Sequence, residues 1–298
     1  MIGRAFAKIN LGLEVLFRRE DGYHELRTIF QTIDFHDRLH FEAAPSRLDL
    51  VSDDPALPQG QENLVIKAAE ALRRSAGVTA GARIELEKRI PWGKGLGGGS
   101  ADAAITLLAL NRLWGLNLPS SELRTLATEV GADVAYFLLG GAALGLGRGE
   151  EVYPLARELD FPVLLILPDF SLETAAVYGS LELTKRQSSN KLHHFVSSVL
   201  DGRDDFRFVS NDLESAAMKV FPPIGIYKGS LIELGAAAAS MSGSGSAVFG
   251  VFRDSAMAHS AARSLASRGV RAIVTRTISR KEYLERRLGV GVQHAGDP

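Results

Sequence analysis

The residues best suited to chemistry lie in one glycine-rich segment, residues 91–100, with the sequence PWGKGLGGGS. Glycine lets backbone amides approach a ligand closely. The apolar residues that follow recur at helical spacing and predict a buried helix from about residue 100 to residue 114. The positive end of that helix points toward the glycines, an arrangement that binds phosphate without a large basic patch. The segment therefore predicts a polyphosphate site.

Other interpretations of this segment differ in how well they fit. A Walker loop does not fit, because Lys94 is followed by Gly95 rather than by Ser or Thr. Gly93, Gly95 and Gly98 match the dinucleotide-binding spacing, but no acidic residue follows about 20 positions later to bind the ribose. A flexible turn without a ligand is the third interpretation. The Ser100 hydroxyl could contact a phosphate or its magnesium, or cap the helix.

A lysine and an aspartate could supply the chemistry beside a phosphate loop. Alternating apolar residues predict a half-buried strand from residue 5 to residue 16, with Lys8 and Asn10 on its polar face. Asp133 precedes an apolar run, where an aspartate often caps a helix. A carboxylate there could instead take the proton of an acceptor hydroxyl, while a lysine keeps it ionised and stabilises phosphoryl charge. Considered one at a time, the simpler interpretations are solvent exposure and helix capping.

Two further segments combine turn residues with groups that can bind a ligand. Residues 21–24, DGYH, are typical of a hairpin tip, but Tyr23 could stack on a base and His24 could hydrogen-bond to it. Residues 242–246, SGSGS, are typical of a tight turn and could also form a second anion nest. Neither segment decides between its two interpretations.

Composition excludes several classes of function. The 298 residues include 34 Lys and Arg and 35 Asp and Glu, so no overall basic field would recruit nucleic acid or an anionic membrane. The absence of cysteine excludes disulfides, thiolate zinc sites and cysteine nucleophiles, and it suits the cytoplasm. The seven histidines show no recognisable metal-ligand spacing. We expect no signal peptide, and glycines interrupt the longest uncharged stretch, residues 234–252.

The elements around these segments suggest two domains, divided near residue 157 into residues 1–157 and 158–298. In the first, the pattern predicts a strand near residues 84–86 and helices at 63–74 and 121–130. In the second, it predicts strands at 163–167, 247–252 and 270–277 and helices at 172–184, 190–201, 211–220 and 255–267. This order is typical of a split βαβ sandwich, and the tail after Leu288 is expected to fray.

Five segments taken in order resemble the GHMP kinase superfamily: AKINL (7–11), DGYHEL (21–26), IPWGKGLGGGSADAA (90–104), GADV (131–134) and SGSGSAVFG (242–250). The resemblance implies an α+β fold of two domains. The N-terminal domain would be a nucleotide-binding α/β unit with helices over its sheet, and the C-terminal domain a ferredoxin-like split βαβ unit. It also implies transfer of the ATP γ-phosphoryl group to an alcohol, with Mg²⁺.

The resemblance also implies roles for individual residues. Asp133 would be the general base, Lys8 its partner and Asn10 a residue that holds the acceptor. AKINL together with DGYH is similar to the GHMP kinases of non-mevalonate isoprenoid biosynthesis. These enzymes phosphorylate a 2-hydroxyl by direct in-line transfer. Their substrate carries a cytidine diphosphate group; Tyr23 would stack on its base and His24 would hydrogen-bond to it.

The remaining site residues follow from the same resemblance. The substrate would also contact Tyr178, on the other face of the cytosine, and Gly243, Ser244 and Gly245 beside the diphosphate. The nucleotide would contact Asn63, Pro91, Trp92, Gly93, Lys94, Gly95, Leu96, Gly97, Gly98, Gly99, Ser100 and Ala101. Ser100 is also an indirect metal candidate. Trp92 and Lys94 depart from the smaller residues usual in the family, and we expect Lys94 to face phosphate or solvent.

Three alternatives remain open at this point. Another GHMP kinase, acting on a mevalonate-like or homoserine-like alcohol, would keep the glycine loop but has no evident use for a base clamp at Tyr23 and His24. A nicotinamide dinucleotide enzyme and a nucleotide-binding protein without activity are the others. We expect a monomer or weak homodimer with no nucleic-acid or membrane partner.

Overall fold

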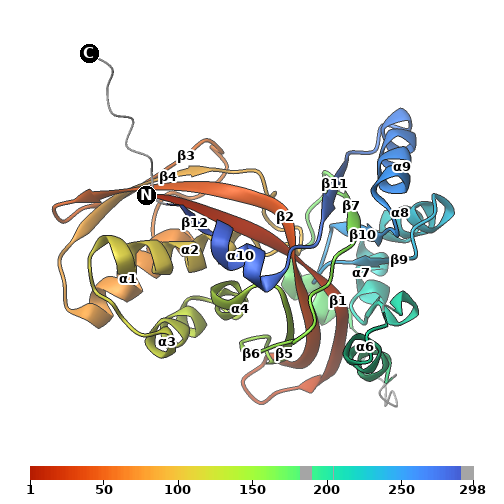
Figure 1. The fold of residues 1–298 in the computed structure, drawn as a ribbon, viewed down its shortest axis with the longest axis horizontal. Helices are drawn as coiled ribbons and strands as arrows, with labels where there is room; N and C mark the ends of the chain where they lie inside the picture. The colour runs from red at the N-terminus through yellow and green to blue at the C-terminus, as the bar shows by residue number, and fades with distance from the viewer. Residues whose placement is uncertain (182–189, 204, 290–298) are drawn as a thin grey trace.

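A long antiparallel hairpin forms the centre of the first sheet in the computed structural model, which describes residues 1–181, 190–203 and 205–289 (Figure 1). Its strands are β1 (Ile2–Arg18) and β2 (His24–Ala44). The predicted strand at residues 5–16 is confirmed, but the prediction of a solvent-facing side is wrong. Residues 5–15 are buried throughout, because helices pack on one face of the sheet and the second domain packs on the other.

Four helices cover one face of the first sheet, below the long strands in Figure 1. They are α1 (Leu64–Ala76), α2 (Gly98–Leu113), α3 (Ser120–Val130) and α4 (Val134–Leu139). The other strands of this sheet are β3 (Leu48–Ser52), β4 (Gly81–Glu87), β5 (Ala142–Gly147), β6 (Glu151–Pro154), β8 (Ser210–Asn211) and β12 (Leu288–Gly289). The helices predicted at 63–74, 100–114 and 121–130 are confirmed within two residues at each end.

The second sheet confirms the ferredoxin-like prediction. Its strands are β7 (Pro162–Ile166), β9 (Ala238–Met241), β10 (Val248–Val251) and β11 (Ala272–Arg276), in the order β11-β7-β10-β9 with antiparallel neighbours. In chain order this is the arrangement 4-1-3-2 of a split βαβ unit. Val163 and Leu165 pack toward the first sheet and Leu164 and Ile166 pack toward helices, so β7 is apolar on both faces.

The second half of the chain contains six α-helices among its described residues. They are α5 (Thr174–Gly179), α6 (Lys191–Leu200), α7 (Glu214–Val220), α8 (Pro223–Glu233), α9 (Ser255–Ser267) and α10 (Arg280–Arg286), with a 3₁₀ turn η1 (Phe206–Phe208). The helix predicted at 172–184 is shorter, and residues 182–189 lie outside the described part. Helix α8 was not predicted because Pro222 and Pro223 at its start and its two glycines are typical of a loop, although proline is tolerated in a first helical turn.

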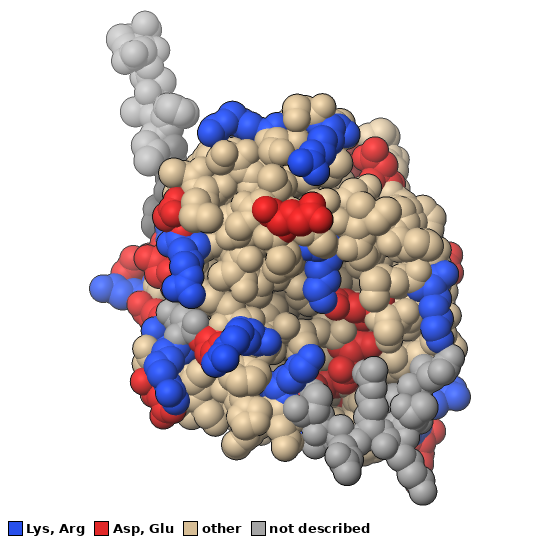
Figure 2. All heavy atoms as spheres, turned by 90° about the vertical axis from the view of Figure 1, so that its right-hand side faces the viewer, with Lys and Arg blue, Asp and Glu red and all other residues tan. Residues whose placement is uncertain are grey.

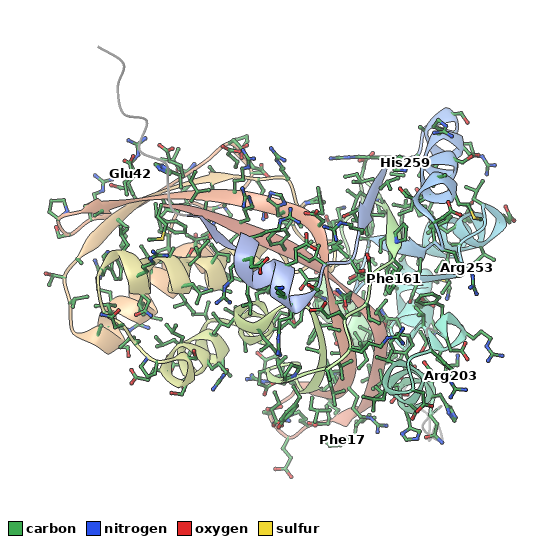
Figure 3. The ribbon with its side chains drawn as sticks, viewed as in Figure 1. Phe17, Glu42, Phe161, Arg203, Arg253 and His259 are labelled. Carbon is green, nitrogen blue, oxygen red and sulfur yellow. The ribbon has the colours of Figure 1, made fainter. Side chains whose placement is uncertain are left out.

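Segments from beyond residue 157 return to the first sheet. β12 pairs antiparallel with β1 at Ile2 and Gly3, and β8 pairs parallel with β1 at Gly12 and Leu13. Figure 3 shows Phe17 and Glu42 at opposite ends of this hairpin sheet, and Phe161 between the two sheets. The domain boundary near residue 157 stays a prediction, as does fraying of the tail, since residues 290–298 lie outside the described part.

Charge is mixed over the face of the second domain seen in Figure 2, where Lys and Arg side chains are interspersed with Asp and Glu. This distribution agrees with a formal net charge of -1. Among the described residues, no helix combines the length and apolar character needed to cross a membrane. The face seen in Figure 2 offers no single-sign field of the kind that attracts a polyanion.

Candidate active site

A cavity of about 950 Å³ opens between the first sheet and the second domain. The glycine loop 93–97, the strands β1 and β2, helix α5 and the loop after β9 all contribute to its wall. The predicted site residues among those that line it are Lys8, Asn10, Tyr23, His24, Gly93, Gly95, Gly97, Asp133, Tyr178, Gly243 and Ser244. Segments separated by more than 200 residues thus meet in one place.

The glycine loop has the backbone conformation expected of an anion site. Gly93, Gly95 and Gly97 have φ of +69°, +75° and +72°, a region that side chains disfavour. Helix α2 starts directly after the loop, at Gly98, so the unpaired amides of its first turn point back toward the loop. The prediction that Ser100 caps this helix is wrong, because the helix starts earlier and the N-cap residue is Gly97.

Gly95 shows how tightly this loop is packed. A Cβ atom at Gly95 would lie 1.9 Å from the carbonyl oxygen of Ser242, in the second small-residue loop. No real side chain can occupy that space. The glycine is therefore required by close approach of two backbones as well as by its φ.

Lys8 and Asp133 meet in the wall of the cavity, with 3.6 Å between Nζ and Oδ2. The β1–β2 register shifts beside Lys8, and the Lys8 amide donates to the Leu96 carbonyl in the glycine loop instead. Such irregularities re-aim side chains near sites. Asp133 stands at the N-cap position of α4 but makes no side-chain cap hydrogen bond, so its carboxylate is available to the cavity.

Burial and charge oppose each other at Lys8. The side chain is 4% exposed, and burial lowers the pKa of its ammonium group below the usual 10.5. Attraction to Asp133 partly reverses that shift in pKa. The ammonium also lies 5.5 Å from the centre of the Phe30 ring. Lys8 is thus a sparsely hydrated cation that a carboxylate holds in place.

A chain of hydrogen bonds fixes the orientation of Lys8. Its Nζ donates to Asn10 Oδ1 at 2.7 Å, Asn10 Nδ2 donates to Thr28 Oγ1 at 2.7 Å, and Thr28 donates to the Gly12 carbonyl at 2.7 Å. Lys8 can only donate, and Thr28 gives its one hydroxyl hydrogen to Gly12, so the Asn10 amide can take only one orientation. Sequence reasoning missed Thr28 and Phe30; a prediction of β2 and its register would have placed both opposite β1.

Aromatic side chains form the other end of the cavity. The rings of His24 and Tyr178 are stacked, with centroids 4.9 Å apart and planes inclined by 28°. Tyr23 is 58% exposed, and the Arg148 guanidinium lies 5.0 Å from the centre of its ring. Burial, and secondarily Arg18, lowers the pKa of His24, which favours the neutral imidazole that both donates and accepts. Arg148 was not predicted, since no pattern in its segment marked it.

Several predicted residues in or beside the glycine loop do not line the cavity. Asn63 caps α1 by accepting from the Val65 amide at 2.9 Å. Trp92 is 55% exposed. The expectation for Lys94 is wrong as regards solvent: its side chain is buried, and Nζ donates to the Phe170 carbonyl at 2.6 Å. The others outside the lining are Pro91, Leu96, Gly98, Gly99, Ser100, Ala101 and Gly245.

The loop suits a nucleoside triphosphate and its magnesium ion. The amides at 93–99 and the start of a 16-residue helix favour phosphate. No group of three or more His, Cys, Asp or Glu suited to a metal occurs in the described part of the chain. Mg²⁺ fits this donor set, because it usually binds through substrate phosphates and only one or two carboxylates.

Comparison with known proteins decides the family. The model of the GHMP kinases N-terminal domain matches residues 63–141, and that of the GHMP kinases C-terminal domain matches residues 202–271. The 4-diphosphocytidyl-2-C-methyl-D-erythritol kinase of Caldanaerobacter subterraneus subsp. tengcongensis is 43% identical over 253 residues, 84% of this chain and 88% of the relative. The chain belongs to the family of 4-diphosphocytidyl-2-C-methyl-D-erythritol kinases. The relative from Chlorobium chlorochromatii is 42% identical, covering 89% of this chain and 93% of its own length.

Solved structures agree with the family assignment. A crystal structure of 4-(cytidine 5'-diphospho)-2C-methyl-D-erythritol kinase is 39% identical, with a TM-score of 0.79 over 93% of this chain and 99% of that one. A homoserine kinase from Cytophaga hutchinsonii has a TM-score of 0.76 over 93% of this chain and 94% of its own, at 20% identity, which shows the shared fold alone. The GHMP kinase fold is confirmed, and the dinucleotide-binding interpretation of the glycine loop is wrong.

Proposed function

We propose that this enzyme transfers the γ-phosphoryl group of ATP to the 2-hydroxyl of 4-diphosphocytidyl-2-C-methyl-D-erythritol. The observation that carries the proposal is the position of the Lys8–Asp133 ion pair in one cavity, with the glycine loop and the aromatic residues also in its wall. This reaction needs a site for the phosphate donor, a proton acceptor and a surface that binds the base. The family's shared activity supports the same conclusion.

In the mechanism we propose, Asp133 accepts the proton of the 2-hydroxyl as its oxygen attacks the γ-phosphorus. The bond from that phosphorus to the bridging oxygen of ADP breaks in the same step, and no phosphoenzyme forms. Lys8 holds the carboxylate in place through the ion pair and stabilises charge on the transferring group. Asn10 orients Lys8 and helps to hold the acceptor. Positioning and electrostatics thus supply most of the rate enhancement.

The nucleotide would lie against the glycine loop, with its phosphates at the amides of residues 93–99. Magnesium, when bound, neutralises charge on the β- and γ-phosphates. The Ser100 hydroxyl, in the first turn of α2, would contact the phosphates or the magnesium ion. The start of α1 lies beside the loop, since a Cβ at Gly99 would be 3.6 Å from Leu64, and Asn63 adjoins it there.

The cytosine would bind at the aromatic end, stacked on Tyr23 and hydrogen-bonded to His24, with Tyr178 on its other face. The His24–Tyr178 stack provides an aromatic surface at this end. Gly243 and Ser244 line the cavity beside Lys8 and so suit the diphosphate side, together with the adjacent Gly245. The aromatic end of the cavity distinguishes this function from phosphorylation of mevalonate-like or homoserine-like alcohols, because those alcohols carry no nucleobase.

A coupled ADP-release assay with Mg²⁺ and ATP tests the proposal. We expect turnover with 4-diphosphocytidyl-2-C-methyl-D-erythritol and none above background with mevalonate or homoserine. Turnover with only one of the latter two would retain the kinase fold and reject the base-binding role of Tyr23 and His24. Consumption of no acceptor, with ATP still bound, would favour a binding protein.

We also propose a cellular setting for the enzyme. It would act in the cytoplasm. A chain without cysteine forms no disulfides and so suits that reducing compartment. It would serve the non-mevalonate route to isoprenoid precursors as a monomer or weak homodimer.

A further inference from the structure

A short segment that the mechanism above does not use, residues 210–214 (SNDLE), lies between the two sheets. Its first two residues form β8, which pairs with β1 at Gly12 and Leu13. The Asp212 amide then donates to the Leu13 carbonyl at 2.9 Å, and Asp212 Oδ2 accepts from the Val15 amide at 3.1 Å. The segment is therefore fastened to the strand that carries Lys8.

Asn211 extends from this segment to the loop after β9. Its side chain is buried, and Nδ2 donates to two carbonyl oxygens, that of Met241 at 2.8 Å and that of Gly243 at 2.7 Å. Its Oδ1 accepts from the Leu213 amide at 2.9 Å. Glu214 supports the same place, because its Oε1 accepts from the Met241 amide at 2.9 Å. Asn211 thus donates one amide hydrogen to the end of β9 and the other to the loop that contains Gly243.

That loop in turn touches the catalytic groups. Ser242 Oγ donates to the Gly95 carbonyl at 2.8 Å, and the Ala247 amide donates to the Lys94 carbonyl at 3.1 Å. A Cβ at Gly243 would lie 3.2 Å from Lys8 Nζ and 3.2 Å from the Gly95 carbonyl oxygen. A shift of residues 242–247 would therefore move the glycine loop and open space beside Lys8.

We propose that Asn211 is a positioning residue that holds residues 242–247 against the glycine loop and Lys8. It acts through Gly243 and is not among the residues that line the cavity. Asparagine is suited to this task because its amide donates to two carbonyl oxygens at once, whereas serine can donate to one and aspartate would present an acceptor to both. The effect on acceptor turnover rests on the proposed function; the effect on nucleotide binding does not.

The test compares Asn211→Ala with Thr277→Val, a matched control in the same domain. Thr277 is also fully buried and also joins two backbone groups, donating to the Leu159 carbonyl at 2.8 Å and accepting from the Phe161 amide at 3.0 Å. Two readouts are measured for each variant: the Kd for ATP with Mg²⁺, from the intrinsic tryptophan fluorescence, and kcat with the cytidylyl substrate.

We expect Asn211→Ala to weaken ATP binding at least about fivefold and to lower kcat at least about tenfold, because small displacements of catalytic groups cost large factors in rate. Thr277→Val should lose comparable thermal stability and keep both constants within about twofold. If Asn211→Ala also keeps both within about twofold, or if Thr277→Val changes them equally, the proposal is overturned. If Asn211→Ala does not fold, Asn211→Ser is judged by the same criterion, with smaller effects expected.

A double-mutant cycle shows whether Asn211 acts through Gly243. We expect Gly243→Ala to produce the same pair of changes, and the Asn211 substitution to add less than about twofold in that background. A full additional effect would overturn the proposal. If the wild-type enzyme binds ATP but phosphorylates no cytidylyl substrate, the proposed function fails, while the change in ATP affinity still decides the role of Asn211.

Discussion

Replacing Asp133 with asparagine probes the proposed chemistry at its centre. The substitution keeps the shape of the side chain and removes its charge. It takes away the group proposed to accept the substrate's proton, and it takes away the carboxylate 3.6 Å from Lys8 Nζ. Because attraction to Asp133 raises the pKa of Lys8 against the effect of burial, that pKa should fall further in the variant.

The size of the effect follows from these two losses. General base catalysis contributes about 10²- to 10⁴-fold, which corresponds to about 2.7–5.4 kcal/mol of activation free energy at about 1.36 kcal/mol per factor of ten. Weaker positive charge at Lys8 acts in the same direction. We therefore expect kcat to fall at least about a hundredfold. ATP affinity should remain within about threefold, because the amides of the glycine loop stay in place.

The assay measures ADP release at saturating ATP and cytidylyl substrate, and the Kd for ATP is measured separately. Asp254→Asn is the matched control, because Asp254 caps α9 on the surface by accepting from the Met257 amide and asparagine caps equally well. Its kcat should stay within about twofold. If Asp133→Asn retains more than about a tenth of the wild-type kcat, Asp133 is not the base and the mechanism proposed here is refuted.

Three further predictions follow from the site and its supports. Tyr23→Ala should raise the KM for the cytidylyl substrate by about 5- to 150-fold, as expected for a lost stacking contact of about 1–3 kcal/mol, while the exposed Tyr153→Ala leaves it unchanged; an unchanged KM in both rejects the stacking role. Gly95→Ala should abolish ATP binding or folding, since its Cβ would lie 1.9 Å from a carbonyl oxygen, whereas Gly229→Ala on α8, with open space, should retain ATP affinity; normal ATP binding by Gly95→Ala would contradict the packing described. Burial lowers the pKa of His36 from 6.5 to about 4, so the unfolded chain binds a proton that the folded chain does not; the free energy of unfolding should fall as pH drops from 6.5 toward about 4, and a curve that His36→Gln does not flatten would rule this out.

Local patterns predicted much of the fold because the decisive elements are strongly periodic. The helix after the glycine loop and the strand that carries Lys8 were located within a few residues. The polar face of that strand was misjudged, since alternation shows which residues share a face but not what covers it. Lys8 is buried because the glycine loop, Asp133 and the loop that contains Gly243 lie against it.

The sequence alone could not bring the site together. Lys8 and Asp133 are 125 positions apart, and only the resemblance to a known family placed them near each other before the structure did. Short strands such as β8 were missed, because their formation depends on pairing with the distant strand β1. Asn211 was missed for the same reason, since its side chain donates to the Met241 carbonyl, 30 residues later.

A structure of the enzyme with the cytidylyl substrate and a non-hydrolysable ATP analogue tests the account most directly. We predict the 2-hydroxyl oxygen at about 2.6–3.2 Å from the Asp133 carboxylate, the range required of a general base. The cytosine should contact Tyr23, His24 and Tyr178, with the triphosphate at the glycine loop. A cytosine bound elsewhere, or a 2-hydroxyl directed away from Asp133 toward another proton acceptor, would contradict the account.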